Sequence, residues 1–185
     1  TNCIQCNQCA MACPHAVIRA KQIAPADLVG APEGFTTVDS KTKNDKGLKY
    51  RIQVYIEDCT GCGVCIETCP AKVKALEFRA LEDERAAGEA KKAEFFENLP
   101  DNVCDGAAPN TVKGAQFRKP LFEFSGACPG CGETPYVKLI TQLFGERMLI
   151  ANATGCSSIY GGTFPTVPYC VSKEGVGPSW ANSLF

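Results

Sequence analysis

The sequence has little histidine, methionine or tryptophan, and almost no net charge. Its 185 residues include one His, two Met and one Trp, and 19 basic side chains nearly balance 20 acidic ones, so the formal net charge is -1. A near-neutral chain has no strong electrostatic attraction to nucleic acid or to an anionic membrane. No apolar stretch approaches the roughly 18 residues needed to span a bilayer. We therefore expect neither a nucleic-acid partner nor a membrane partner.

Cysteine, in contrast, is abundant. Eight of the 13 cysteines form two runs with the same internal spacing, Cys3-x2-Cys6-x2-Cys9-x3-Cys13-Pro14 and Cys59-x2-Cys62-x2-Cys65-x3-Cys69-Pro70. This repeat resembles the signature of bacterial two-cluster ferredoxins, in which the fourth cysteine of each run binds the other cluster. It predicts one [4Fe–4S] cluster held by Cys3, Cys6, Cys9 and Cys69, and a second held by Cys59, Cys62, Cys65 and Cys13. We therefore expect the chain to transfer electrons.

Two other uses of these cysteines fit the pattern less well. Disulfides are disfavoured because the sequence shows no signal segment and because cysteines two residues apart are poor bridging partners. Structural zinc normally uses paired Cys-x2-Cys motifs, without a third and fourth cysteine in tandem. Thiolates of oxygen-sensitive clusters suit a reducing cytoplasm, which is the compartment that we expect.

The segments around the two cysteine runs also repeat. Residues 16–23 form a short β-rich segment after the first run, and residues 73–78 are its expected counterpart after the second. Residues 50–56 alternate apolar and polar side chains, which predicts a strand leading into the second cysteine loop. The intervening residues 25–47, rich in Gly, Pro, Lys and Asp, predict a solvated insertion or a docking loop. His15 is expected to be an exposed loop residue with no catalytic part.

The composition changes after residue 80. Residues 81–99 are rich in Glu, Ala, Lys and Arg, with Phe95, Phe96 and Leu99 near the end. This pattern predicts a mostly solvent-facing helix that docks by its C-terminal end, with its charges on a solvated face. Residues 100–120 then predict a linker. Cys104 in the linker, and Cys170 further on, match no ligand spacing and are interpreted as spare thiols.

A second unit begins near residue 121. Residues 121–124 predict a short strand, and residues 136–144 a helix with Thr134 as N-cap, Pro135 in the first turn and Gly145 at its end. Residues 147–152 are apolar without alternation, as in a buried parallel strand, and lead into a turn of small residues. Strand, helix, strand and Gly-rich turn describe the opening of an α/β domain, whose ligands bind at the carboxyl ends of strands.

Three further cysteines belong to this second unit. Cys128 and Cys131 form a Cys-x2-Cys pair, and Cys156 follows the predicted parallel strand. Because loops after successive parallel strands converge, these three cysteines are expected to meet in an incomplete cluster site. The alternative is a redox-active dithiol at Cys128 and Cys131, with Cys156 unrelated to it.

The motifs together resemble a known enzyme family. The run Cys128-Pro-Gly-Cys-Gly-Glu-Thr-Pro-Tyr-Val-Lys-Leu-Ile-Thr-Gln-Leu-Phe-Gly145, followed by Ile150-Ala-Asn-Ala-Thr-Gly-Cys-Ser-Ser158, resembles the thiamine-diphosphate domain of pyruvate:ferredoxin oxidoreductases. Asn2-Cys-Ile-Gln-Cys-Asn-Gln-Cys9 and Cys59-Thr-Gly-Cys-Gly-Val-Cys65 resemble the ferredoxin-type domain of the same enzymes. The likeness covers almost the whole chain, except the variable residues 82–116.

The resemblance implies a role for each matched residue. Cys128, Cys131 and Cys156 would be three of the four ligands of a third [4Fe–4S] cluster. Cys156, with Gly155 and Ser157, would also line the thiamine diphosphate, and Glu133 would approach that cofactor. Glu133 is equally typical of a carboxylate stabilised at a helix N-terminus, and Gly155 of an ordinary turn glycine. The magnesium-binding residues and the fourth cysteine would lie beyond residue 185.

The implied reaction is the oxidative decarboxylation of pyruvate with coenzyme A to acetyl-CoA and carbon dioxide. Electrons would pass through the clusters to ferredoxin or flavodoxin, in a homodimer of the full-length chain. Three alternatives stay open: a pyruvate:NADP oxidoreductase, an oxidoreductase of another 2-oxoacid, and a stand-alone ferredoxin-type electron carrier. The pocket residues that choose the 2-oxoacid would lie largely outside the chain.

We therefore expect an α+β chain in two parts. Residues 1–99 would form the ferredoxin-type domain with two [4Fe–4S] clusters and a C-terminal helix, and residues 100–120 a linker. Residues 121–185 would form the opening βαβ part of an α/β thiamine-diphosphate-binding domain. Because the chain begins without Met and two residues before its first cysteine, we interpret it as a piece of a longer polypeptide that holds no complete catalytic site.

Overall fold

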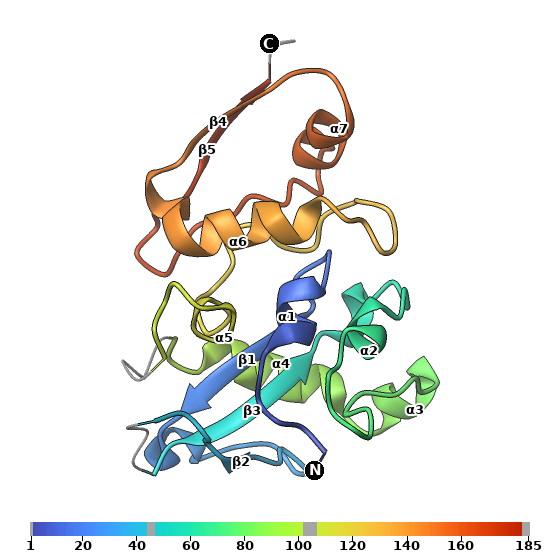
Figure 1. Ribbon diagram of the computed structural model, residues 1–185, viewed down its shortest axis with the longest axis vertical. Coiled ribbons are helices and arrows are strands. Elements are labelled where there is room, and N and C mark those ends of the chain that lie inside the picture. Colours follow the sequence, from blue (N-terminus) through green and yellow to red (C-terminus); the bar gives the residue numbers. More distant parts are fainter. Residues whose placement is uncertain (1, 44–46, 102–106, 183–185) are drawn as a thin grey trace.

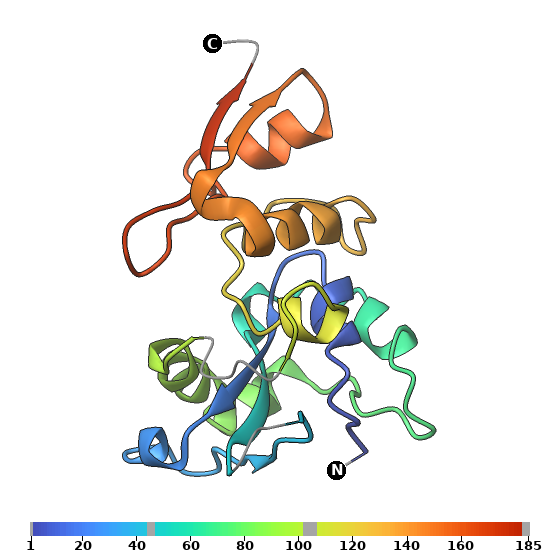
Figure 2. The same cartoon turned by 60° about the vertical axis from the view of Figure 1, so that its left-hand side comes forward.

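A computed structural model of the chain describes residues 2–43, 47–101 and 107–182. Figure 1 shows a cysteine-rich lower part built on a small sheet, and an upper part containing strands β4 and β5 and helix α7. Helix α6 lies across the middle, between the upper strands and helix α1 of the lower part. The turned view in Figure 2 keeps the same order of layers. The two parts are in packed contact, because α6 lies against α1. The domain bounds expected at 1–99 and 121–185 stay a prediction.

The lower sheet has three strands in the order β1-β3-β2. Strands β1 (Ile18–Ile23) and β3 (Lys49–Val54) pair antiparallel, with Ala20 opposite Ile52. The short β2 (Val38–Asp39) pairs antiparallel with β3 and comes from the predicted insertion, after the 3-10 turn η1 (Pro25–Leu28). The strands expected within 16–23 and 50–56 are therefore confirmed, and part of the insertion belongs to the sheet.

Each cysteine run contains a short helix that includes its third cysteine. Helix α1 (Gln8–Ala12) contains Cys9, and helix α2 (Val64–Glu67), after the 3-10 turn η2 (Ile56–Asp58), contains Cys65. The strand expected at 73–78 is wrong: this segment is irregular, and Val73 and Phe78 are exposed. β-branched and aromatic side chains favour a strand only where a neighbouring strand supplies hydrogen bonds, and the lower sheet of the described residues ends at β1 and β2.

The single helix expected over 81–99 is divided in two. Helices α3 (Leu81–Ala86) and α4 (Glu89–Asn98) are separated at Gly88, which has a left-handed φ of 73° that interrupts the helix. The predicted docking by the C-terminal end is confirmed, because Phe96 is fully buried and Leu99 nearly so, in one cluster with Ile23.

Residues 107–120 are packed, in contrast to the expected linker. Helix α5 (Val112–Ala115) is capped by Thr111, whose Oγ1 accepts from the Gly114 N–H at 3.1 Å. The Phe117 ring is buried edge-on against Tyr50, with 6.2 Å between ring centroids. Aromatic burial of this kind fixes the segment to the sheet. Cys104 lies outside the described residues.

The upper part contains helix α6 (Thr134–Phe144), the turn η3 (Gly145–Arg147), strand β4 (Leu149–Asn152), helix α7 (Cys156–Gly162) and strand β5 (Ser179–Asn182). Helix α6 has its proline in the first turn and ends at Gly145, as predicted, but Glu133 is the N-cap and no side chain caps the helix. Residues 121–124 form only an isolated bridge between Phe122 and Tyr169 instead of a strand.

Strand β4 pairs in parallel with β5, which agrees with the predicted parallel strand. Its expected burial is wrong, because Leu149 is 87% exposed and only alternate residues of β4 are partly covered. An apolar sequence makes a strand suited to burial, but the strand is buried only where other elements cover both faces of its sheet. Figure 1 shows α7 on one side of this strand pair.

Among the described residues, no helix is both long enough and apolar enough to cross a membrane.

Candidate electron-transfer site

The first cysteine loop places two polar side chains where the backbone turns. Gln5 and Asn7 have left-handed φ values of 60° and 61°, and both are 1% exposed. Gln5 Nε2 donates to Asp39 O at 2.8 Å, and its Oε1 accepts from the Lys41 N–H at 2.8 Å. A left-handed conformation is costly for residues other than glycine, and these hydrogen bonds offset the cost. The insertion therefore supports the first loop.

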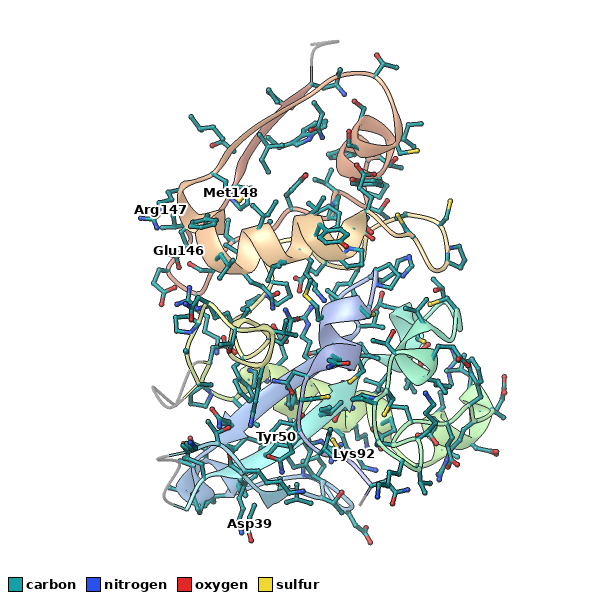
Figure 3. All side chains as sticks on the ribbon, viewed as in Figure 1. Asp39, Tyr50, Lys92, Glu146, Arg147 and Met148 are labelled. Carbon is teal, nitrogen blue, oxygen red and sulfur yellow. The ribbon has the colours of Figure 1, made fainter. Side chains whose placement is uncertain are left out.

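Asn7 is held from the other side. Its Nδ2 donates to Lys113 O at 2.9 Å, and its Oδ1 accepts from the Tyr50 hydroxyl at 2.7 Å. Tyr50 comes from β3 and lies within the lower part (Figure 3). Helix α5 and the sheet thus anchor the same loop. The first loop is pre-organised by side chains, which agrees with its buried Cys9.

The second loop reaches the same backbone shape with glycine. Gly61 and Gly63 have φ values of 66° and 78° at the positions that correspond to Gln5 and Asn7 in the repeat. Here Cys59 and Cys62 are exposed. The two loops therefore present similar turns, one buried among hydrogen-bonded side chains and one open to solvent.

The two short helices bring the runs together. Helices α1 and α2 are in contact, and Cys9 lies close enough to Cys65 for their charges to interact. Cys65 also interacts with Cys59 and Cys62 of its own run and with Cys13 of the other. Cys65 of the second run therefore lies near both Cys9 and Cys13 of the first. The crossed assignment of Cys13 and Cys69 to the two clusters stays a prediction.

Burial strongly affects these thiols. It raises the pKa of the Cys9 thiol to about 12 and that of Cys65 to about 11, and the neighbouring cysteines add to both shifts. A thiol with such a pKa holds its proton in neutral solution. Positive charge from bound metal would reverse this preference, because thiolates are the metal ligands.

The described cysteines form neither a disulfide nor a compact group of ligands for a single ion. The 12 described cysteines are all free thiols. Within the described residues, no three Cys, His, Asp or Glu side chains converge on one point that a single ion would occupy. A cubane binds each cysteine at a different iron, so its ligands surround it at a distance from one another. The two turn-rich loops fit such a cluster.

Each short helix ends against a lysine. Lys138, on α6, is 1% exposed, and its Nζ donates to Met11 O at 3.0 Å, to Cys13 O at 3.5 Å and to Ala10 O. Burial lowers the pKa of Lys138 to about 8, although the nearby Cys13 and Cys9 oppose the shift. At the end of α2, exposed Lys74 donates to Glu67 O at 3.0 Å and to Cys69 O at 2.9 Å.

The third cysteine group is more open. Cys128 and Cys156 are exposed, and Cys131 is partly covered at the start of α6. Burial acts to raise the pKa of Cys131, but the backbone N–H groups of Thr134 and Glu133 outweigh it and hold the pKa below its usual value. Cys156 begins α7. Within the described part of the chain, α7 approaches the pair of Cys128 and Cys131 through Tyr160. The pKa of Tyr160 is raised by burial and by the nearby Glu133 and Cys131.

The residues expected at thiamine diphosphate do not form a closed site. Glu133 and Gly155 are exposed, and Ser157 is half-buried. Gly155 has φ 152° and open space where a Cβ would be, and Ser157 O accepts from Asn152 Nδ2 at 3.1 Å.

The third group lies beside the second loop. A Cβ added to Gly130, between Cys128 and Cys131, would lie 3.9 Å from Cys62 Cβ. His15, two residues after Cys13, has Nε2 2.9 Å from Ala127 O, next to Cys128. The expectation that His15 is exposed is wrong, since it is 3% exposed. Its burial follows from the packing of the second unit on the Cys-Pro turn.

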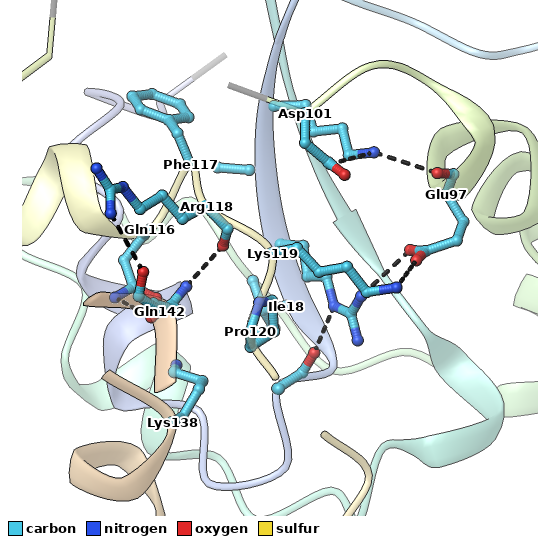
Figure 4. Close-up of a pocket in the computed structure, with 14 residues that line it drawn as sticks. Ile18, Glu97, Asp101, Gln116, Phe117, Arg118, Lys119, Pro120, Lys138 and Gln142 are labelled. Atoms are coloured by element: carbon cyan, nitrogen blue, oxygen red, sulfur yellow. Dashed lines mark hydrogen bonds and ion pairs between the residues drawn. The ribbon is translucent and has the colours of Figure 1, made fainter. Parts of the chain in front are cut away.

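A charged cluster joins the two units near this contact. Figure 4 shows residues of β1, the 116–120 segment and α6 that line a small cavity. The volume of this cavity is about 20 Å³. Arg19 Nη1 pairs with Glu97 at 3.2 Å, and Lys119 Nζ pairs with the same carboxylate at 3.3 Å. Gln142 donates to Arg118 O at 2.9 Å. A cavity of this volume and polarity has room for one water molecule.

Comparison with known proteins first defines the class. Residues 2–73 match the protein family described as a 4Fe-4S dicluster domain. These residues include both cysteine runs and the sheet strands between them. The chain therefore contains an iron–sulfur domain of the two-cluster type.

Longer relatives define the family. The chain is 62% identical, over all of its length, to "Pyruvate:ferredoxin oxidoreductase" of Moorella thermoacetica, and 50% identical, over 99% of its length, to "Pyruvate-flavodoxin oxidoreductase" of Nostoc. It is 52% identical over all of its length to "Pyruvate dehydrogenase [NADP(+)], mitochondrial" of Euglena gracilis. The chain spans 16% of the first two relatives and 10% of the third. It belongs to the pyruvate:ferredoxin and pyruvate:flavodoxin oxidoreductases, of which it represents a segment.

Sequence reasoning missed several residues of this site. Gln5 and Asn7 could have been found by aligning the two runs, because they stand where the second run has glycine. Lys138 could not, since nothing along the chain indicates that α6 lies beside Cys13.

Cys170 is a partly covered thiol, and its Sγ lies 3.6 Å from Pro120 O. Burial raises the pKa of this thiol to about 12.

Proposed function

We propose that this chain is the electron-transfer segment of an enzyme that oxidises pyruvate with coenzyme A to acetyl-CoA and carbon dioxide. Its acceptor would be ferredoxin or flavodoxin. The observation that carries the proposal is the proximity of Cys13 to Cys65 of the other cysteine run, in a chain whose relatives bear these enzyme names. [4Fe–4S] clusters, when bound, supply one-electron carriers, and thiamine diphosphate supplies the carbanion sink.

Within this proposal the residues of the chain fall into a series. The loop of Cys128 and Cys131 lies at Cys62, and Cys65 in turn lies near Cys9. Electrons would pass in that order, from the third cysteine group to the second loop and then to the first. The eight ligands would be Cys3, Cys6, Cys9 and Cys69 for one cluster and Cys59, Cys62, Cys65 and Cys13 for the other.

The alternatives receive less support. A stand-alone carrier would not need the 121–185 segment, which the relatives share with the rest of the chain. The NADP-linked relative of Euglena gracilis is 52% identical to the chain, against 62% for the ferredoxin-linked relative of Moorella thermoacetica. The choice among 2-oxoacids rests on the relatives' names, all of which refer to pyruvate.

The finer assignments of the second unit belong to the same proposal. Glu133, Gly155, Cys156 and Ser157 would approach the thiamine diphosphate, with its magnesium bound elsewhere, and Cys128, Cys131 and Cys156 would give three ligands to a third cluster. The supporting observation is that Tyr160 of α7 lies beside Glu133 and Cys131. Residues 1–99 and 121–185 would be the two domains of this segment, and the full-length chain would form a homodimer in the cytoplasm.

Anaerobic reconstitution tests the proposal. The purified chain should bind about eight irons and as much sulfide, four for each of two clusters, and show spin-coupled EPR signals when reduced. It should show no pyruvate turnover by itself. One or two zinc ions in place of iron, or a colourless protein after loading, would contradict the assignment.

A further inference from the structure

Lys138 is the only lysine of the described residues that reaches a cysteine run of the first unit from the second unit. It lies on α6, one turn after Thr134, and contacts the end of α1 at Ala10, Met11 and Cys13. Figure 4 shows its side chain at the edge of the charged cavity, beside Gln142 of the same helix. The side chain thus crosses the contact between the two units.

The surroundings of Lys138 require a charged ammonium group. Its three recorded partners are all backbone carbonyl oxygens, which only accept hydrogen bonds. An ammonium group has three donors and matches three acceptors, whereas a neutral amine has only two. The last carbonyls of a helix also carry its partial negative charge, which attracts a cation. Lys138 therefore places a positive charge inside the protein, next to Cys13.

Such a charge acts on whatever Cys13 binds. Reduction adds one negative charge to a cluster, and a buried cation favours the more negative state because the low dielectric screens it little. Hydrogen bonds and nearby charge are among the features that set cluster potentials. Lys138 interacts with Cys13 more strongly than with Cys9, so its effect should be larger on the cluster that contains Cys13.

We propose that Lys138 is a positioning residue that raises the reduction potential of the Cys13 cluster from α6, the helix that begins at Thr134. This inference rests on the cluster assignment proposed above. Cys128 and Cys131 directly precede this helix, and Lys138 lies one turn inside it. Any displacement of α6 would therefore change the distance between the cation and the second cluster. The second unit would in this way influence the cluster that accepts its electrons.

The repeat supplies a matched control. Lys74 contacts Glu67 O and Cys69 O at the end of α2, as Lys138 contacts the end of α1, but Lys74 is exposed. Solvent and salt screen an exposed charge, so Lys74 should contribute much less to its own cluster. The pair thus separates the effect of a buried cation from the effect of any lysine at this position of the repeat.

The test measures midpoint potentials by EPR-monitored redox titration of the reconstituted full chain. Lys138→Met removes the charge and the donors, Lys138→Gln removes the charge but keeps an amide donor, and Lys138→Arg keeps the charge. Lys74→Met is the control. Iron and sulfide analysis is performed first on each protein, and each titration is repeated with Cys3→Ala, which removes a ligand of the other cluster.

At the midpoint potential of the unsubstituted protein, both neutral Lys138 variants should lower the ratio of reduced to oxidised Cys13 cluster by roughly tenfold or more. Lys138→Arg should keep this ratio near its original value. Lys74→Met should change the ratio of reduced to oxidised cluster at the Cys69 site by less than about threefold. The Lys138 and Lys74 variants that keep Cys3 should have the iron content of the unsubstituted chain.

An unchanged potential in neutral variants with full iron content would overturn the inference and leave the cluster assignment intact. So would an equal shift with Lys74→Met, or a shift with Lys138→Arg as large as with Lys138→Met. Loss of clusters in both neutral variants would assign Lys138 to assembly and would also overturn it. Absence of clusters from the unsubstituted chain would instead contradict the proposed function.

Discussion

Replacing Cys13 and Cys59 together with alanine should leave one intact [4Fe–4S] cluster, whereas replacing Cys13 and Cys3 together should leave none. Cys13 interacts with Cys65 of the second group, so Cys13 and Cys59 should belong to the same cluster. Cys3 belongs to the first group, so its replacement together with Cys13 would damage both clusters. A cubane that loses a thiolate loses an iron or the whole cluster, so each damaged site should give up its reduced [4Fe–4S] signal.

Iron and sulfide analysis with EPR of the dithionite-reduced proteins measures this result. The first double variant should keep about half of the original spin intensity, and the second close to none. Cys170→Ala is the control and should keep both clusters, because Cys170 lies outside both cysteine runs and its Sγ is 3.6 Å from Pro120 O. The opposite order of the two double variants would show that each run binds its own cluster without crossing.

Replacing Phe96 with alanine should destabilise the chain by about 3–5 kcal/mol. Phe96 has no exposed surface and packs with Ile23 and Leu99, and Lys21 Nζ lies 5.1 Å from its ring centroid. The substitution would remove this packing and leave a cavity beneath the sheet, which the surrounding side chains would fill only in part. Helix α4 would then lose its main attachment to β1.

Anaerobic urea denaturation of the cluster-loaded chain measures the effect as a lower midpoint with an unchanged slope. Phe95→Ala on the same helix is the matched control. Phe95 is only half-buried and contacts Phe35 edge-on at 4.9 Å between centroids, so its loss should cost clearly less. An equal loss of stability in the two variants would contradict the assignment of Phe96, and not Phe95, to the buried core.

The cysteine runs show how far sequence reasoning reaches in this chain. Ligand spacing is a local property, because three cysteines two residues apart must share one tight loop wherever that loop lies. The strands that follow the first run and precede the second were also predictable from alternation. The strand expected at 73–78 failed because a strand requires a neighbour, and residue order alone does not provide one.

The second unit shows the opposite case. Residues 100–120 have the composition of a linker, yet Phe117 packs against Tyr50 and fixes the segment to the sheet. Strand β4 has the apolar sequence of a buried strand and is largely exposed. In both cases burial depends on which surface lies opposite, which composition does not record.

The sequence by itself determined the chemical class of this protein. Two identically spaced cysteine runs and a third group indicate iron–sulfur electron transfer, because thiolate number and spacing select the metal centre. Only the tertiary structure decided that His15 is buried beside Ala127 and that Lys138 lies beside the end of α1. These contacts join residues more than 40 positions apart, and they exist only after the chain has packed.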